Sequence, residues 1–170
     1  MRLSAHGITT ELPAGWEGRI TRRRRQAPVA ASSGPTTSSS RAGAIGSPDE
    51  SPEPVVHLAN FALPEDRGDF GSGAVDLMRS GHVFMTLFEY GPESVGQALF
   101  ASQGMPTLRP KMFASSALQK TITGQAGCQR FFTHNGRPFC LYVVLGKQAE
   151  AATLVPKANG VLAATTIDPR

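Results

Sequence analysis

Asn135-Gly136 stands in the middle of residues 128–145, a run rich in aromatic and β-branched residues. An Asn-Gly pair readily adopts the positive φ angles of a type I′ turn, so this run is predicted to form a β-hairpin. A two-residue loop pairs His134 with Arg137 and distributes the side chains over two faces. One face then carries Cys128, Phe132, Phe139, Leu141, Val143 and Leu145, and the other carries Gln129, Phe131, Thr133, Cys140, Tyr142 and Val144. Because both faces contain large apolar groups, both are expected to be covered.

Other periodic segments predict further strands and helices. Strands are expected over residues 55–63 and 83–90. Helices are expected over residues 70–78, 94–102 and 153–164. Asp69 is the expected N-cap of the first helix and Gly81 its stop. The last helix, with Pro156 in its first turn, is expected to cover the second hairpin face. These elements predict the α+β class and a three-layer α/β/α sandwich around a mainly antiparallel sheet.

The chain is predicted to be one domain interrupted by an insert. Residues 1–21 are expected to be an N-terminal arm, in which 7–20 form a hairpin that turns at Pro13-Ala14-Gly15. In residues 26–54, 22 of the 29 residues are Ser, Pro, Gly, Thr or Ala and none is aromatic. Such a composition buries too little apolar surface to offset its ordering entropy, so 22–54 is predicted to be disordered. Residues 55–170 complete the domain.

The net charge of the chain is concentrated at the start of that insert. Lys and Arg number 17 and Asp and Glu 13, which gives +4, and four adjacent arginines account for all of it. These are Arg22, Arg23, Arg24 and Arg25. One interpretation is a solvated charge block that begins a linker. The other is electrostatic contact with the phosphates of nucleic acid or an anionic membrane surface.

The sequence contains no recognisable motif for catalysis or metal binding. With the two-residue loop, Cys128 and Cys140 face opposite sides of the hairpin; with a three-residue loop they share a face but lie roughly 13 Å apart. No disulfide is therefore expected, and both are interpreted as buried core cysteines. The four histidines lack the spacing of metal ligands. We expect no enzyme activity, no cofactor and no metal.

Trp16 is the only tryptophan and directly follows the Pro13-Ala14-Gly15 turn. Its first interpretation is a hydrophobic anchor that holds the N-terminal arm on the sheet. The second is a ring on which a ligand stacks.

Nothing in the sequence predicts passage through a membrane. No apolar run approaches the roughly 20 residues that a membrane helix requires. The start of the chain carries Arg2, His6, Glu11 and Glu17 where a secretory signal would be apolar. We therefore expect a cytoplasmic protein without a transmembrane segment.

Residues 7–16, Gly-Ile-Thr-Thr-Glu-Leu-Pro-Ala-Gly-Trp, are a strand-like run that ends in a Pro-x-Gly-Trp turn. This opening resembles the start of PsbP-like domains, and residues 124–127, 139–145 and 165–167 fit the same plan of elements. That fold is shared by a Ran-binding nuclear import factor and by adaptor chaperones of secretion effectors, and the chain is also similar to uncharacterised actinobacterial proteins. The resemblance implies an α/β/α sandwich that binds proteins, and it transfers no functional residue.

Three functions remain open at this point. The leading hypothesis is a non-enzymatic protein-binding adaptor, chaperone or accessory subunit of a larger assembly. The first alternative is an electrostatic binder of nucleic acid or anionic membrane through the arginine block. The second is a small-molecule binding protein or an enzyme without a recognisable motif.

Overall fold

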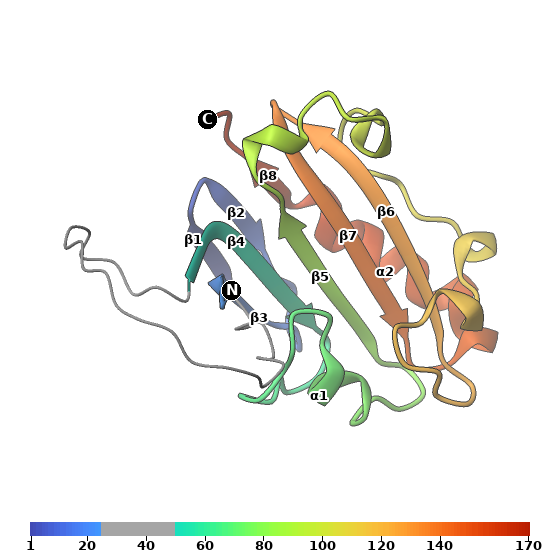
Figure 1. The fold of residues 1–170 in the computed structure, drawn as a ribbon. Helices are drawn as coiled ribbons and strands as arrows, with labels where there is room; N and C mark the ends of the chain where they lie inside the picture. The colour runs from blue at the N-terminus through green and yellow to red at the C-terminus, as the bar shows by residue number, and fades with distance from the viewer. Residues whose placement is uncertain (25–49) are drawn as a thin grey trace, which may run out of the picture.

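A computed structural model of the chain describes residues 1–24 and 50–170 (Figure 1). Its strands are β1 (Arg2–Ala5), β2 (Ile8–Glu11), β3 (Glu17–Arg24), β4 (Glu50–Ala59), β5 (Val83–Glu89), β6 (Ala126–His134), β7 (Arg137–Leu145) and β8 (Thr165–Ile167). Its α-helices are α1 (Ser72–Val75) and α2 (Ala151–Ala163). Short 3₁₀ turns are η1 (Pro92–Ser94), η2 (Ala98–Phe100), η3 (Pro110–Met112), η4 (Ser115–Ala117) and η5 (Gln148–Glu150).

The strands of the described residues form two antiparallel sheets. The larger sheet has five strands in the order β3-β4-β5-β7-β6, and the smaller has three in the order β1-β2-β8. Long antiparallel strands with few helices place the chain in the α+β class, as the sequence predicts.

The β6–β7 hairpin is the element that the sequence predicts best. His134 pairs with Arg137, and Asn135 and Gly136 have φ angles of 49° and 74°. The register, the turn and the two faces are therefore confirmed. Leu141 lies on one face, which we call the helix face, with Val56, Leu58, Met85, Leu87 and Val143. Tyr142 lies on the other, which we call the loop face, with Val55, His57, Phe84, Phe88 and Cys140.

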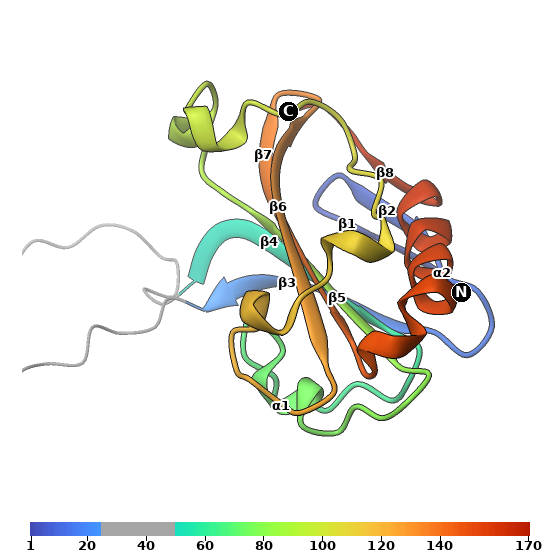
Figure 2. The same cartoon turned by 90° about the vertical axis from the view of Figure 1, so that its right-hand side faces the viewer.

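The helix face is covered by α2 and by the small sheet, which lie on the same side of the large sheet (Figure 2). Buried Leu154 and Val161 of α2 join Leu141 and Ile167 in one core cluster. The prediction that the last helix covers the second hairpin face is therefore wrong. The helix leads directly into β8, and β8 pairs with β2 of the small sheet. The helix and the small sheet therefore lie on the same side of the large sheet. Pro156 lies inside α2 rather than in its first turn.

The loop face is covered by connecting segments and by α1. Gly71, with φ 74°, precedes this four-residue helix, and a Cβ at Gly71 would lie 2.2 Å from the Phe84 ring. The longer helix over 70–78 and its Asp69 cap are therefore wrong. The backbone carbonyl of Asp69 instead accepts hydrogen bonds from His57 Nε2 at 3.0 Å and from Thr86 Oγ1 at 3.2 Å. These bonds attach the segment to the sheet, and a longer helix would remove them from reach.

The helix predicted over 94–102 is also wrong. The segment contains only the 3₁₀ turns η1 and η2. Gly96 separates them with φ 84°, in the left-handed region, and this conformation interrupts a helix.

The N-terminal arm differs from the predicted hairpin. The two arms of 7–20 lie in different sheets, because β2 pairs with β1 and β8 while β3 pairs with β4. The hairpin that does form is β1–β2, and its turn residues His6 and Gly7 have φ angles of 54° and 72°. That geometry matches a two-residue I′ turn. The Pro13–Gly15 turn therefore moves the chain from one sheet to the other.

The strands also extend into the predicted insert. Arg24 pairs with Glu50 and Arg22 with Pro54, with a register shift between the two pairs. Residues 22–24 and 50–54 therefore belong to strands, because pairing between two neighbouring antiparallel strands can outweigh an unfavourable composition. Residues 25–49, including Arg25, lie outside the described residues.

Candidate functional site

The outer edge of β6 is open in its middle and covered at both ends. At one end Gly127 and Ala114 exchange N–H···O bonds of 3.0 Å. At the other, the Thr133 N–H donates to Ser102 O and the Thr133 carbonyl accepts from Gly104 N, each at 2.8 Å. Backbone groups of a strand point to the same side at every second residue. Those of Gln129 and Phe131 therefore also point outward, and within the described residues they have no backbone partner.

The opening exists because the chain leaves the edge at Gly104 and returns at Ala114. In between, Leu108 is buried in the core, and its N–H and C=O bond the Asn159 side chain of α2, both at 2.9 Å. Residues 105–113, between these two contacts, are tied to α2 through Leu108 and pass beside β6 without a backbone hydrogen bond to it (Figure 2).

A groove of about 490 Å³ lies along this open stretch, and we call it the edge groove. Residues 129–132 of β6 form one wall, and Leu99 with residues 102–107 form the other. Leu99 is 56% exposed, so this wall offers an accessible apolar side chain. Of the described residues that line the groove, only Arg130 carries a charge.

This arrangement can take a further strand. Unpaired N–H and C=O groups on a sheet edge are a template for an extended chain, and neighbouring pockets then select its side chains. An extended segment of about three residues spans the distance from Gln129 to Phe131. Apolar Leu99 and cationic Arg130 favour a segment that presents both an apolar and an acidic side chain.

Arg22, Arg23 and Arg24 of the arginine block belong to β3, at the opposite edge of the large sheet. Arg22 is exposed on β3, and Arg23 and Arg24 continue that strand. Three strands separate β3 from β6 in the sheet order. The structure therefore does not bring these three arginines and the edge groove together.

Trp16 is buried, with 8% of its surface exposed, and belongs to the core cluster of the helix face. Ile8 and Leu12 of the N-terminal arm lie in the same cluster. The ring is therefore positioned between the arm and the large sheet. Its role in stability stays a prediction.

The cysteines are free and buried on opposite faces, as the hairpin register predicts. Burial raises the pKa of the Cys140 thiol to about 11 and raises that of Cys128, although Arg130 opposes the shift at Cys128. A raised pKa keeps a thiol protonated and lowers its nucleophilicity at neutral pH.

His57 is a buried residue of β4. Burial lowers its pKa to about 4, so the imidazole is neutral at pH 7. Its Nδ1 atom has no hydrogen-bond partner. Within residues 1–24 and 50–170, no cluster of three or more His, Cys, Asp or Glu residues could hold a metal ion.

Glu89 and Arg137 form a buried ion pair that the sequence analysis did not predict. The Arg137 guanidinium donates to both carboxylate oxygens of Glu89, at 2.9 and 2.6 Å, and to the carbonyls of His6, Gly7 and Asp168. Arg170 also contacts Glu89 at 2.9 Å. These bonds join the small sheet to the large one. The only signal in the sequence is one charged residue at the end of an apolar strand, Glu89 in β5, and another at the start of the next but one, Arg137 in β7, which is too common to be specific.

Comparison of the sequence with protein-family models, curated proteins and solved structures finds no significant match. In the part of the chain that the structure describes, no helix has the length and apolar content needed to cross a bilayer. The candidate site therefore rests on the geometry of this chain alone.

Proposed function

We propose that this protein is a non-enzymatic adaptor that binds an extended segment of a partner protein in the edge groove. The observation that carries the proposal is the pair of outward-facing residues, Gln129 and Phe131, left unpaired between two covered ends of β6. A partner strand would bond both N–H and both C=O groups, while Leu99 and Arg130 contact its side chains. The three-layer PsbP-like architecture is part of the same proposal, and it rests on the resemblance in residues 7–16 and on the order of the elements.

The occupant is expected to be another protein rather than a second copy of this chain. The open stretch is short, because Gly127 and Thr133 are already paired on either side. Two copies joined edge to edge would have to bring two such recessed stretches together past residues 104–114. A thin extended peptide avoids that obstacle.

The test is selection from a library of random short peptides, followed by two matched variants. Gln129→Pro removes one outward N–H without removing a bond to β7, because that N–H points away from the sheet. Gln129→Ala removes the same side chain, including its bond to Cys140 Sγ at 3.3 Å, and keeps the N–H.

Selected peptides are expected to bind the wild type and Gln129→Ala alike. They are expected to bind Gln129→Pro at least about tenfold more weakly, equivalent to about 1.4 kcal/mol. Thermal unfolding of each variant checks that the fold is retained. Equal binding to Gln129→Pro, or a concentration-dependent dimer in place of peptide binding, contradicts the proposal.

The electrostatic alternative has one observation in its favour, the exposure of Arg22 on β3. It predicts salt-sensitive binding to nucleic acid or anionic vesicles that is lost when Arg22, Arg23, Arg24 and Arg25 are changed to Ser. The same variant leaves peptide binding in the edge groove unchanged, so the two functions are distinguishable.

A further inference from the structure

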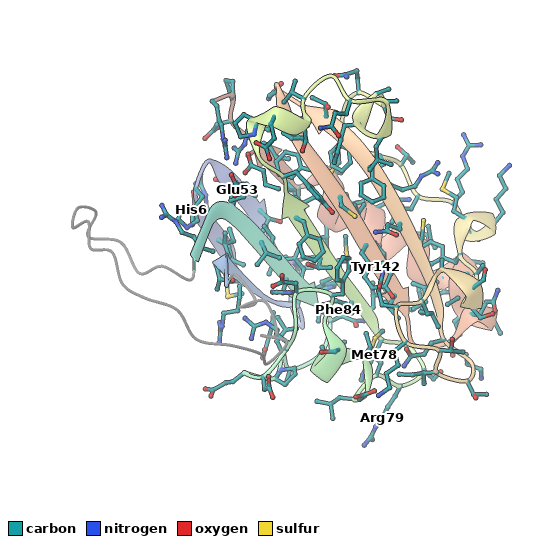
Figure 3. All side chains as sticks on the ribbon, in the orientation of Figure 1. His6, Glu53, Met78, Arg79, Phe84 and Tyr142 are labelled. Carbon is teal, nitrogen blue, oxygen red and sulfur yellow. The ribbon has the colours of Figure 1, made fainter. Side chains whose placement is uncertain are left out.

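A second, smaller pocket lies on the loop face, between α1 and the residues that follow η4. Its volume is about 130 Å³, and we call it the Tyr142 pocket. Phe70, Val75 and Leu118 are its apolar walls, and the exposed Lys120 stands at its rim. Figure 3 shows Tyr142 on the face of the large sheet turned toward the viewer, away from α2.

Gln125 lines this pocket and carries an acceptor that has no partner among the described residues. The residue is 3% exposed, and its Nε2 donates to Val75 O at 2.8 Å. That bond fixes the orientation of the amide, because the flipped form would place two acceptor oxygens against each other. Oε1 is then buried without a hydrogen-bond partner.

Tyr142 supplies a donor. The residue is 1% exposed, and its hydroxyl oxygen accepts from the Gln119 N–H at 3.0 Å. Burial raises the pKa of Tyr142, so the hydroxyl keeps its proton at neutral pH. Within the described residues the structure gives that proton no acceptor.

The polar groups and the volume together define what fits. A buried acceptor without a partner is unfavourable, so a ligand that donates a hydrogen bond to it is favoured. A cavity of about 150 Å³ with apolar walls accommodates benzene. The Tyr142 pocket is of similar size, and Lys120 at its rim already pairs with Asp76 at 2.8 Å. Since Lys120 is the only charged residue among the described residues that line the pocket and it is already paired, an uncharged ligand is expected.

We propose that the Tyr142 pocket binds a small uncharged ring compound that donates an N–H or O–H to Gln125 Oε1 and accepts from the Tyr142 hydroxyl. Cyclic amides, which carry a donor and a carbonyl acceptor on one ring, are the simplest members of this class. The site is separate from the edge groove and does not depend on the function proposed for it.

The test compares two probes of nearly equal size, 2-pyridone and benzene, by NMR titration of the full chain. The side-chain amide signals of Gln125 report directly on the site. The wild type is expected to bind 2-pyridone at least about tenfold more tightly than benzene. Gln125→Met keeps the approximate size of the side chain and removes the acceptor together with the donor to Val75 O. It is expected to weaken 2-pyridone binding about tenfold and to leave benzene binding unchanged.

Leu118→Phe fills the pocket from its half-buried wall and is expected to weaken both probes. Equal affinity of the wild type for 2-pyridone and benzene overturns the proposal, because the polar pair then plays no part in recognition. Absence of any shift in the Gln125 signals overturns it as well and leaves the pocket as a site for water only. These two outcomes use the wild-type protein, so they hold even if a variant fails to fold.

Discussion

The two faces of the large sheet are covered by different kinds of structure. The helix face is covered by α2 and the small sheet, and its core contains Trp16, Leu154 and Ile167. The loop face is covered by α1 and irregular segments. Of the four buried side-chain polar atoms without partners in the described residues, three are on or above the loop face, namely His57 Nδ1, Arg67 Nε and Gln125 Oε1. The Tyr142 pocket lies there too.

The difference shows how a cover determines what a sheet face can do. Regular elements satisfy their own backbone groups and present side chains at fixed intervals, so they fill a face closely. Irregular segments must bond their backbone to side chains of the sheet, as Asp69 does with His57 and Thr86. Such a cover leaves gaps and unsatisfied atoms. We therefore expect stability to come mainly from the helix face and small-ligand binding from the loop face.

The largest expected effect is on the helix face. Trp16→Ala should lower the free energy of unfolding by about 4 kcal/mol, because a large buried ring leaves a cavity. Phe61→Ala, which removes a half-buried ring from the loop face, should cost less than half as much. Urea denaturation measures both. A loss below about 1 kcal/mol for Trp16→Ala would contradict the anchor role and favour a ligand-facing ring.

The next effect concerns the ion pair that joins the two sheets at the end of the helix face. Arg137→Met should lower the free energy of unfolding by about 3 kcal/mol or more, because Glu89 stays buried and three backbone carbonyls lose a donor. The double variant Glu89→Leu with Arg137→Met removes both charges and should lose less than the single variant. If Arg137→Met is neutral in denaturation experiments, the pair does not hold the small sheet in place.

A smaller, pH-dependent effect is expected from the loop face. The pKa of His57 is about 4 in the folded protein, against about 6.5 in an unfolded chain. As the pH falls below about 6.5, the unfolded state therefore binds a proton that the folded state does not. Stability should decline by up to about 1.4 kcal/mol per pH unit on this account.

Gln in place of His57 retains a donor for the Asp69 carbonyl and does not titrate. Between pH 6.5 and 5, the His57→Gln variant should lose less stability than the wild type in urea denaturation. Parallel pH profiles for the two proteins would show that His57 is not buried as a neutral group.

The sequence predicts this fold where local rules decide the structure. The Asn135-Gly136 turn needs only positive φ angles and a period of two, so register and faces follow from the hairpin itself. The hairpin predicted over residues 7–20 is wrong because that range begins at Gly7. It therefore omits β1 and His6, the first residue of the turn that joins β1 to β2. The strand that pairs with β3 is β4, which follows residues 25–49 in the sequence. The face of the large sheet that α2 covers depends on the pairing of β8 with β2. These are long-range choices.

The candidate sites are still less visible in the sequence. The edge groove exists because Asn159 of α2 holds Leu108 away from β6, a contact between residues far apart in the chain. The Oε1 atom of Gln125 is left as a free acceptor because Nε2 of the same amide donates to the carbonyl of Val75. Trp16 and Arg22–Arg24 stand out in the sequence, but they line neither the edge groove nor the Tyr142 pocket.

The open edge of β6 is tested most directly by amide hydrogen exchange measured residue by residue. In the free protein, the amides of Gln129 and Phe131 should exchange rapidly, while those of Gly127 and Thr133, which are bonded to Ala114 and Ser102, should exchange slowly. With a selected peptide bound, Gln129 and Phe131 should become as slow as their neighbours. Protection of both amides in the free protein, or rapid exchange that persists in the complex, would contradict strand addition at this edge.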